Sequence, residues 1–144
     1  MDELTQTKLG RPFFTRAEAL DSGWSDRSLA AAVRAQYLHR ICWGYYILSE
    51  VWEPLTLTER YQLKCQVTLH SLGPNVALSH VSAVVAHGLA TWGVPLDLVH
   101  VTRLDGGSGR TEAGVVHHEG LCRDGDIVEV VGGLATVRDR AVVE

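Results

Sequence analysis

The side chains best suited to binding chemistry are arginines and hydroxyls between residues 25 and 40. Arg27 and Arg34 are seven residues apart, close to two helical turns, so one helix face would carry both guanidinium groups. Ala30 and Ala31 lie between them and are small enough to allow close approach to a groove. The sequence has no Asp or Glu from Arg27 to Ser49, so this stretch is locally positive. Such a pattern is suited to contacts with phosphates and base edges.

Two short helices and a β-ribbon would have to position these side chains. Thr15 and Glu18 have the spacing of a capping box, which predicts that a helix begins just after Thr15. Gly23 is expected to end that helix, and Ser25 is expected to cap the next one. The two helices would therefore be joined by a tight turn.

The second helix is predicted over about residues 26–36, and a two-stranded ribbon is predicted over about 38–47. Leu29 and Val33 are four residues apart and indicate the core-facing side of this helix. Helix, turn, helix and ribbon in this order predict a winged helix-turn-helix domain over residues 1–51, with the helix in the major groove of double-stranded DNA and the ribbon at the phosphates or minor groove. The predicted DNA-binding residues are Ser25, Arg27, Ser28, Arg34, His39, Arg40, Trp43 and Tyr45.

A purely structural interpretation of the same residues stays open. Short amphipathic helices with a solvated arginine face are common in proteins of every function. Trp43 or Tyr46 can equally pack beneath the ribbon as part of a core.

Composition limits the classes of protein that remain. The chain of 144 residues is 46% hydrophobic and 21% charged, which is ordinary for a folded globular protein. Its net charge of −4 argues against binding nucleic acid over the whole surface, but not against a local basic face. Cys42, Cys65 and Cys122 are odd in number and widely spaced, which predicts neither a disulfide framework nor a CxxC metal site. With a polar N-terminus and no long apolar run, the sequence predicts a cytoplasmic protein that does not bind membranes.

Residues 52–144 are predicted to form a second domain of helices and antiparallel strands, so that the whole chain is α+β. Thr56 and Glu59 form another capping box before a helix whose apolar stripe is Leu57, Tyr61, Cys65, Leu69 and Leu72. A second helix is predicted over residues 79–88, capped by Ser79 and facing inward with Val81, Val84 and Val85. Segments 98–103 and 114–118 are expected to pair as antiparallel strands, and 126–131 with 134–138 to form a hairpin turned by Gly132 and Gly133.

The seven histidines raise the question of a metal site. His80 and His87 are seven residues apart on one predicted helix face, and one of His117 and His118 could approach them from a strand. The sequence positions no carboxylate beside them as a general base, so structural roles are the favoured interpretation. We accordingly predict no metal, no cofactor, no catalytic residue and no enzymatic activity. The glycine cluster 106–109 lacks the Lys-Ser or Lys-Thr of a phosphate-binding loop and is interpreted as a connection between strands.

Several short segments together resemble the AbiEi family. They are Phe14–Leu20, the turn Gly23-Trp24-Ser25, the ribbon segments Leu38–Ile41 and Gly44–Tyr46, and above all Leu78-Ser-His-Val-Ser-Ala83 with Ala86-His-Gly-Leu89. The AbiEi family consists of transcriptional regulators that act as antitoxins of AbiE, or type IV, toxin–antitoxin systems. The resemblance runs from about Phe13 to the end of the chain. Members typically continue beyond the second hairpin, which implies that this chain is either truncated or a short relative.

The resemblance implies an N-terminal winged helix that binds operator inverted repeats upstream of its own operon, with a homodimer as the expected form. It also implies a C-terminal region that neutralises a partner toxin, a nucleotidyltransferase-like protein. Two functional classes thus remain: a sequence-specific DNA-binding repressor, and a protein-interaction module that binds a toxin without specific DNA binding.

Overall fold

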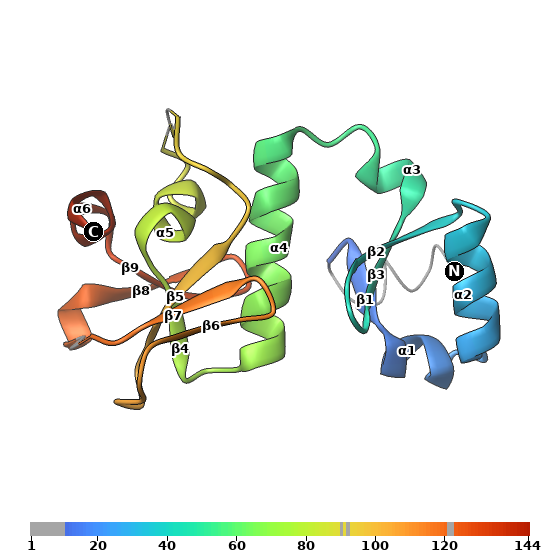
Figure 1. Ribbon diagram of the computed structural model, residues 1–144, viewed down its shortest axis with the longest axis horizontal. Helices are drawn as coiled ribbons and strands as arrows, with labels where there is room; N and C mark the ends of the chain where they lie inside the picture. The colour runs from blue at the N-terminus through green and yellow to red at the C-terminus, as the bar shows by residue number, and fades with distance from the viewer. Residues whose placement is uncertain (1–10, 90, 92, 121–122) are drawn as a thin grey trace. The chain divides into compact units, whose positions relative to one another are not determined.

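The computed structural model describes residues 11–89, 91, 93–120 and 123–144, and within these ranges the protein is α+β (Figure 1). The described residues form six α-helices, a three-stranded antiparallel sheet and a six-stranded mixed sheet. The chain divides between Leu55 and Thr56 into two compact units, Met1–Leu55 (unit 1) and Thr56–Glu144 (unit 2). No helix in the described part of the chain has both the length and the apolar character needed to cross a membrane.

Unit 1 combines three short helices with a small sheet. Its elements are β1 (Phe13–Thr15), α1 (Arg16–Asp21), α2 (Asp26–Arg34), β2 (Leu38–Cys42), β3 (Tyr45–Leu48) and α3 (Ser49–Trp52). The strand order is β1-β3-β2, and both neighbouring pairs are antiparallel. Strand β1 therefore pairs with β3 along the edge that faces away from β2.

Local hydrogen bonds explain where helices α1 and α2 begin, and they confirm both predicted caps. The Glu18 amide donates to Thr15 Oγ1 at 3.2 Å while the Thr15 amide donates to Glu18 Oε1 at 2.9 Å. Ser25 caps α2 by accepting the Ser28 amide at 3.1 Å. Gly23, at φ +97°, supplies the left-handed turn between them. The second helix ends at Arg34, and Gln36 has a φ of +60° that a right-handed helix cannot adopt.

The core of unit 1 lies between the helices and one face of the sheet. Leu29 is buried as predicted, and Val33 packs against the same cluster while remaining half-buried. The buried residues of this cluster are Phe14, Ala19, Leu29, Ala32, Leu38, Tyr46 and Leu48. Burial of each large apolar side chain is worth about 1.5–3 kcal/mol, so this cluster is what holds α1 and α2 to the sheet.

Unit 2 packs three helices against a six-stranded sheet of order β6-β7-β5-β4-β9-β8. Its elements are α4 (Leu57–Leu72), β4 (Val76–Leu78), α5 (His80–Ala86), β5 (Val99–Arg103), β6 (Arg110–Glu112), β7 (Val115–His118), a 3₁₀ turn (Asp124–Asp126), β8 (Ile127–Val130), β9 (Gly133–Thr136) and α6 (Arg138–Val143). The capping box of Thr56 and Glu59 begins α4, as predicted. The three-residue strand β4 was not predicted from the sequence.

The predicted antiparallel pairing of segments 98–103 and 114–118 is wrong. The two strands β5 and β7 are parallel, and β4 and β9 are also parallel, so the sheet is mixed. The tight turn lies instead at Ala113 and Gly114, where positive φ angles of +52° and +79° join the extra strand β6 to β7. Alternating apolar residues predict a strand but not the direction in which it pairs. The glycine-rich segment between β5 and β7 was interpreted as a simple connection, so the sequence did not reveal that β6 lies within it.

The β8–β9 hairpin is confirmed, but its turn lies one residue earlier than expected. Val130 pairs with Gly133, so the two turn residues are Val131 and Gly132. Gly132 has a φ of +95°, whereas Gly133 belongs to β9 and lies against Leu69, whose Cδ1 would be 3.2 Å from an added Cβ. Gly133 therefore serves close packing on α4 rather than the turn.

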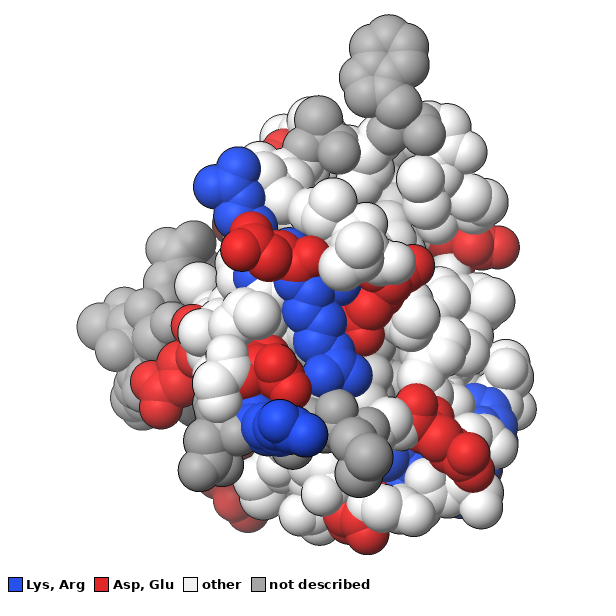
Figure 2. All heavy atoms as spheres, turned by 90° about the vertical axis from the view of Figure 1, so that its left-hand side faces the viewer, with Lys and Arg blue, Asp and Glu red and all other residues white. Residues whose placement is uncertain are grey.

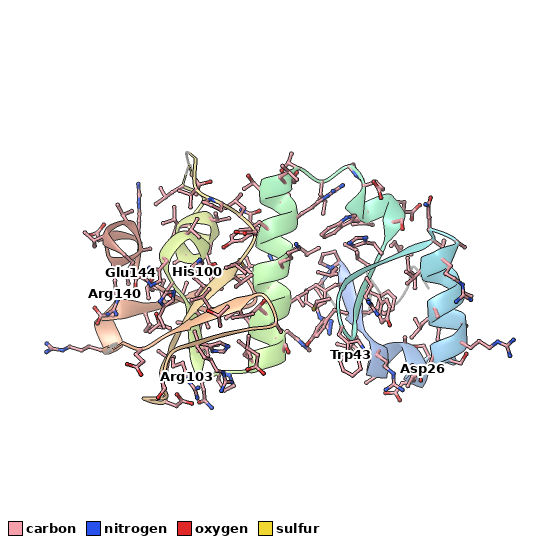
Figure 3. All side chains as sticks on the ribbon, viewed as in Figure 1. Asp26, Trp43, His100, Arg103, Arg140 and Glu144 are labelled. Atoms are coloured by element: carbon pink, nitrogen blue, oxygen red, sulfur yellow. The ribbon has the colours of Figure 1, made fainter. Side chains whose placement is uncertain are left out.

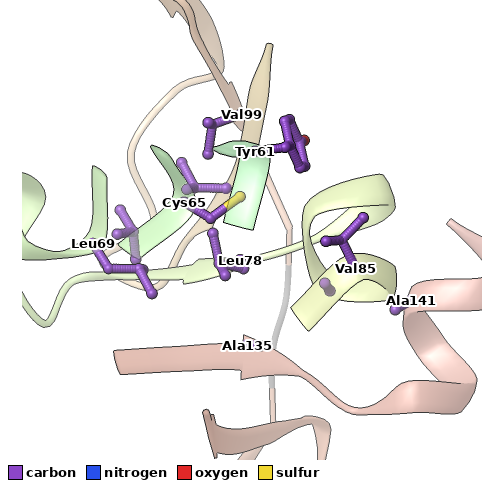
Figure 4. Close-up of a cluster of buried hydrophobic side chains, with 11 residues drawn as sticks. Tyr61, Cys65, Leu69, Leu78, Val85, Val99, Ala135 and Ala141 are labelled. Carbon is purple, nitrogen blue, oxygen red and sulfur yellow. The ribbon is translucent and has the colours of Figure 1, made fainter. Parts of the chain in front are cut away.

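The main core of unit 2 lies between α4, α5, α6 and the central strands (Figure 4). Tyr61, Cys65 and Leu69 form the buried stripe of α4, as predicted, and Val85 of α5 is buried with them. The prediction was wrong at both ends of α4, because Leu57 is 77% exposed and Leu72 is 36% exposed. Helical spacing identifies a face but not how far along the helix the rest of the protein covers it.

Candidate functional site

The exposed face of α2 carries the two arginines singled out by their spacing. Arg27 and Arg34 are both exposed, while Leu29 and Ala32 are buried on the opposite side of the helix. A separation of seven residues corresponds to a rise of about 10 Å along the helix axis. The two guanidinium groups are therefore presented to solvent from one face of a helix that is held by its other face.

Ser25 and Ser28 form the start of α2, and their hydroxyls are already engaged with each other and with backbone groups. Ser28 Oγ accepts the Ser25 amide at 2.8 Å and donates to the Ser25 carbonyl at 2.9 Å. Asp26, in the same turn, is paired bidentately with Arg16 at 2.6 and 2.7 Å, and this hydrogen bonding lowers the pKa of Asp26. A contact from either serine to DNA would therefore replace or share a bond that begins the helix.

The β2–β3 hairpin separates the predicted ribbon residues onto two faces of the sheet. Arg40 pairs with Tyr46 and shares its face with Leu38, which belongs to the helix-side core. Arg40 itself is exposed. The arginine therefore extends from the same side of the sheet as α1 and α2.

His39 and Tyr45 lie on the opposite face. The His39 ring stacks on Trp52 with 4.2 Å between centroids and an interplanar angle of 14°, and the Tyr45 ring lies 5.9 Å from that of Phe13. Neighbouring residues on a strand point to opposite faces, so His39 and Arg40 do not reach toward one surface together. The structure thus separates His39 and Tyr45 from the arginine face of α2, and the sequence signal for this was the two-residue alternation.

Trp43 is 86% exposed at the tip of the hairpin, next to Gly44 with its φ of +84°. The Gly44 carbonyl accepts the Arg16 amide at 2.9 Å, and the Arg16 guanidinium binds Asp26 at the start of α2. This chain of contacts ties the hairpin tip to the beginning of both helices. Figure 3 accordingly shows Trp43 and Asp26 at the same end of unit 1.

The histidines of unit 2 do not gather as the sequence suggested. His87 is separate from the others, because its Nε2 donates to the Thr136 carbonyl at 2.8 Å. The residues that do meet are His80, His118 and His100, the last of which sequence reasoning missed. His100 Nδ1 and His118 Nε2 are hydrogen-bonded at 2.9 Å, and the described residues contain no group of three side chains arranged to hold a metal ion. A signal was available in the predicted pairing of segments 98–103 and 114–118, which places His100 on the strand next to the one that carries His118.

Ser79 occupies the N-cap position of α5, but its side chain makes no capping hydrogen bond, contrary to prediction. The Ser79 hydroxyl is fully buried and has no hydrogen-bond partner among the described residues. The amide of His80 is instead accepted by Glu144 Oε1 at 3.0 Å. A distant carboxylate therefore takes the place of the local cap.

A cavity of about 140 Å³ lies beside α4 and α5, lined in part by Gln62, Cys65 and Ser82. Burial raises the pKa of the Cys65 thiol to about 12. The thiol is consequently protonated at neutral pH and is a weak nucleophile there. Ser82 Oγ is bound by Tyr61 Oη at 2.7 Å and accepts the His100 amide at 2.8 Å, so it has a structural role beneath β5.

We expect a chelator such as EDTA to change neither the melting temperature nor duplex binding. The reason is that His100 and His118 are already bonded to each other and no third ligand completes a site with them among the described residues. Differential scanning fluorimetry with and without EDTA tests this. A structural zinc ion would contribute a large share of the folding free energy, so a marked fall in melting temperature would contradict the expectation.

Figure 2 views the end of unit 2 that carries α6 and shows basic and acidic side chains interleaved there. One source of this pattern is Arg140, which lies between Asp126 at 3.1 Å and Glu144 at 3.4 Å. The face therefore offers no continuous positive surface among its described residues. In unit 1, by contrast, the stretch from Arg27 to Ser49 contains arginines and no Asp or Glu.

The chain was compared with protein-family models, with curated proteins and with solved structures, and none of the three comparisons gave a match.

Proposed function

We propose that this protein is a sequence-specific DNA-binding transcriptional regulator whose unit 1 acts as a winged helix-turn-helix. In this proposal α1 and α2 form the helix-turn-helix, α2 is the recognition helix, and the β2–β3 hairpin is the wing. The strand order β1-β3-β2 and the core shared by both helices and the sheet support it. So does the hydrogen bond that fixes the hairpin tip to the start of α1.

The observation that carries the proposal is the two-faced α2 with its exposed Arg27 and Arg34. Recognition helices combine a buried apolar side with a side that bears donors for phosphates and base edges, and arginine is the commonest donor to guanine. Arg40 adds a third exposed cation on the helix side of the sheet. Trp43 at the hairpin tip offers an aromatic surface to the sugar-phosphate backbone or the minor groove.

The proposal extends to an autorepressing antitoxin, on the strength of the AbiEi resemblance. In that role unit 1 binds inverted operator repeats as part of a homodimer, and unit 2 binds a toxin. The alternative, a module that binds a protein partner without specific DNA binding, predicts no sequence preference in any duplex assay.

The deciding experiment is selection of binding sites from a random duplex library, followed by fluorescence anisotropy with the selected site and a scrambled duplex. A regulator binds the selected duplex at least 1,000-fold more tightly, in keeping with the specificity of known regulators, which is roughly 10³-fold or more. Binding should also weaken steeply as salt rises, because phosphate contacts release counterions. Equal and weak binding to both duplexes would leave the protein-interaction module as the better reading.

Arg40→Ala is expected to weaken binding to all duplexes by a similar factor and to reduce the slope of log affinity against log salt by about one unit. The physical reason is that a wing cation on the helix side of the sheet meets phosphates, which carry no sequence information. Anisotropy titrations at four salt concentrations measure the slope. The matched control is Arg110→Ala in unit 2, another exposed arginine, which should leave the slope unaltered. An unchanged slope in Arg40→Ala would place the wing contact at another residue.

A further inference from the structure

Three histidine rings from three different elements meet on one side of the unit 2 sheet. His80 begins α5, His100 is on β5 and His118 is on β7. The ring centroids of His80 and His118 are 3.8 Å apart, and His80 lies 5.7 Å from His100. His100 Nδ1 and His118 Nε2 complete the cluster with their 2.9 Å hydrogen bond. These three rings are called the histidine cluster below.

The backbone of His80 connects this cluster to the C-terminal helix α6. The His80 amide donates to Glu144 Oε1 at 3.0 Å, and the same oxygen accepts Thr136 Oγ1 at 3.1 Å. The other carboxylate oxygen of Glu144 accepts Arg140 Nε at 3.4 Å. Helices α5 and α6 pack against each other, with Ala141 buried in the shared core. Figure 3 shows Glu144, Arg140 and His100 on the same side of unit 2.

His80 adopts a left-handed backbone conformation, with a φ of +52°. A residue with a Cβ pays of order 1–3 kcal/mol for such a conformation, which persists only where surrounding contacts impose it. The contacts that impose it include the ring against His118 and His100 on one side and the amide bond to Glu144 on the other. Loss of the ring contact would therefore allow the backbone to relax and the bond to Glu144 to break.

The hydrogen bond between His100 and His118 requires that at least one of its two nitrogens is unprotonated. A first proton on the cluster is compensated by Glu144, whose charge also favours the cationic form of His118. A second proton would place two cationic rings within a few ångströms of each other, and among the described residues Glu144 is the one carboxylate whose charge acts on His118. Other charged or titratable groups nearby are Arg140, which is held by Glu144, Asp97, whose charge acts on His100, and His117, whose charge acts on His118.

We propose that the histidine cluster is a proton-operated latch: with at most one proton it holds His80 in place and α6 docked on α5, and a second proton releases α6. The latch is independent of DNA binding by unit 1. Its consequence is a pH-dependent surface, because release of α6 exposes the α5 side of the unit 2 core that Ala141 covers.

The direction of the pH dependence follows from the surroundings of the rings. Burial, and secondly the neighbouring His80, lower the pKa values of His100 and His118 below the ordinary value of 6.5. The released and unfolded forms, with solvated rings, bind more protons than the docked form. The stability of the docked form is therefore fully present above about pH 6.5 and is lost as the pH falls below it.

A titration of the ¹⁵N-labelled protein from pH 8 to pH 5 by NMR tests the latch. Long-range spectra follow the ring nitrogens of each histidine, and amide spectra follow His80 and Ala141. We expect the amides of His80 and Ala141 to shift together at a midpoint below pH 6.5 that matches the second protonation of the cluster. In His118→Gln this common step should disappear, whereas His70→Gln, which alters an exposed histidine of α4, should retain it.

The wild-type titration alone is sufficient to overturn the proposal, even if His118→Gln fails to fold. If the rings titrate while the Ala141 amide stays unchanged, the cluster does not control α6. If His100 and His118 titrate at or above pH 6.5, the cluster does not resist its second proton. A common step that persists in a folded His118→Gln would likewise exclude the latch.

Discussion

Replacing Arg27 and Arg34 together with alanine is expected to abolish sequence-specific duplex binding while leaving the unfolding transition nearly unchanged. A good arginine contact to a base edge is worth about 1–3 kcal/mol, so loss of two such contacts weakens specific binding by roughly 30-fold at the least. Both side chains are exposed, and substitutions at exposed positions usually change the free energy of unfolding by less than about 0.5 kcal/mol. Anisotropy and urea denaturation measure the two quantities separately.

The control for net charge is the double variant Arg110→Ala with Arg138→Ala. These arginines are also exposed but belong to unit 2, so the control removes the same two charges from elsewhere. It should bind the selected duplex with nearly wild-type affinity. Equal losses in both double variants would mean that total charge, rather than the face of α2, governs binding, and the assignment of α2 as recognition helix would be abandoned.

Leu69→Ala is expected to destabilise unit 2 by about 2–5 kcal/mol, the range measured for large-to-small changes in packed cores. Leu69 is 4% exposed in the main core and lies against Gly133 of β9, so truncation leaves a void between α4 and the sheet. Such a loss is comparable to the whole stability of many small domains. Urea denaturation followed by circular dichroism measures it.

Leu57→Ala provides a matched comparison on the same helix. Leu57 is 77% exposed, so the same substitution should alter the free energy of unfolding by less than about 0.5 kcal/mol. Alanine is also the better helix former, which offsets any small loss of contact. Similar destabilisation by both variants would show that α4 is covered along its whole length, contrary to the packing described above.

Helix starts and sheet direction differed in how far the sequence could predict them. Helix starts were predictable because the hydrogen bonds of a capping box form within four consecutive residues. The examples are Thr15 with Glu18, Ser25 with Ser28, and Thr56 with Glu59. Sheet direction was not, because β5 and β7 have the same alternating pattern whether they run parallel or antiparallel. The direction in which β5 and β7 pair depends on the path of the chain between them, which includes β6.

The candidate interface was predictable to a similar extent. The exposed Arg27 and Arg34 follow from helical spacing, since Leu29 specifies which face of the helix is buried. The opposite orientations of His39 and Arg40 could also be predicted from strand alternation. The stacking of His39 on Trp52 could not, because the two residues are thirteen positions apart along the chain.

By itself the sequence determined features that depend on neighbours along the chain: the caps at Thr15, Ser25 and Thr56, the turn at Gly23, the middle of the buried stripe of α4 and the acid-free stretch from Arg27 to Ser49. Only the tertiary structure decided which distant side chains meet. His80, His100 and His118 come together with Glu144 because parallel pairing of β5 and β7 sets two rings on one face and α6 folds back on α5. Contacts of this kind form only when long loops close around a common core. The spacing of residues along the chain does not indicate which distant segments such loops bring together.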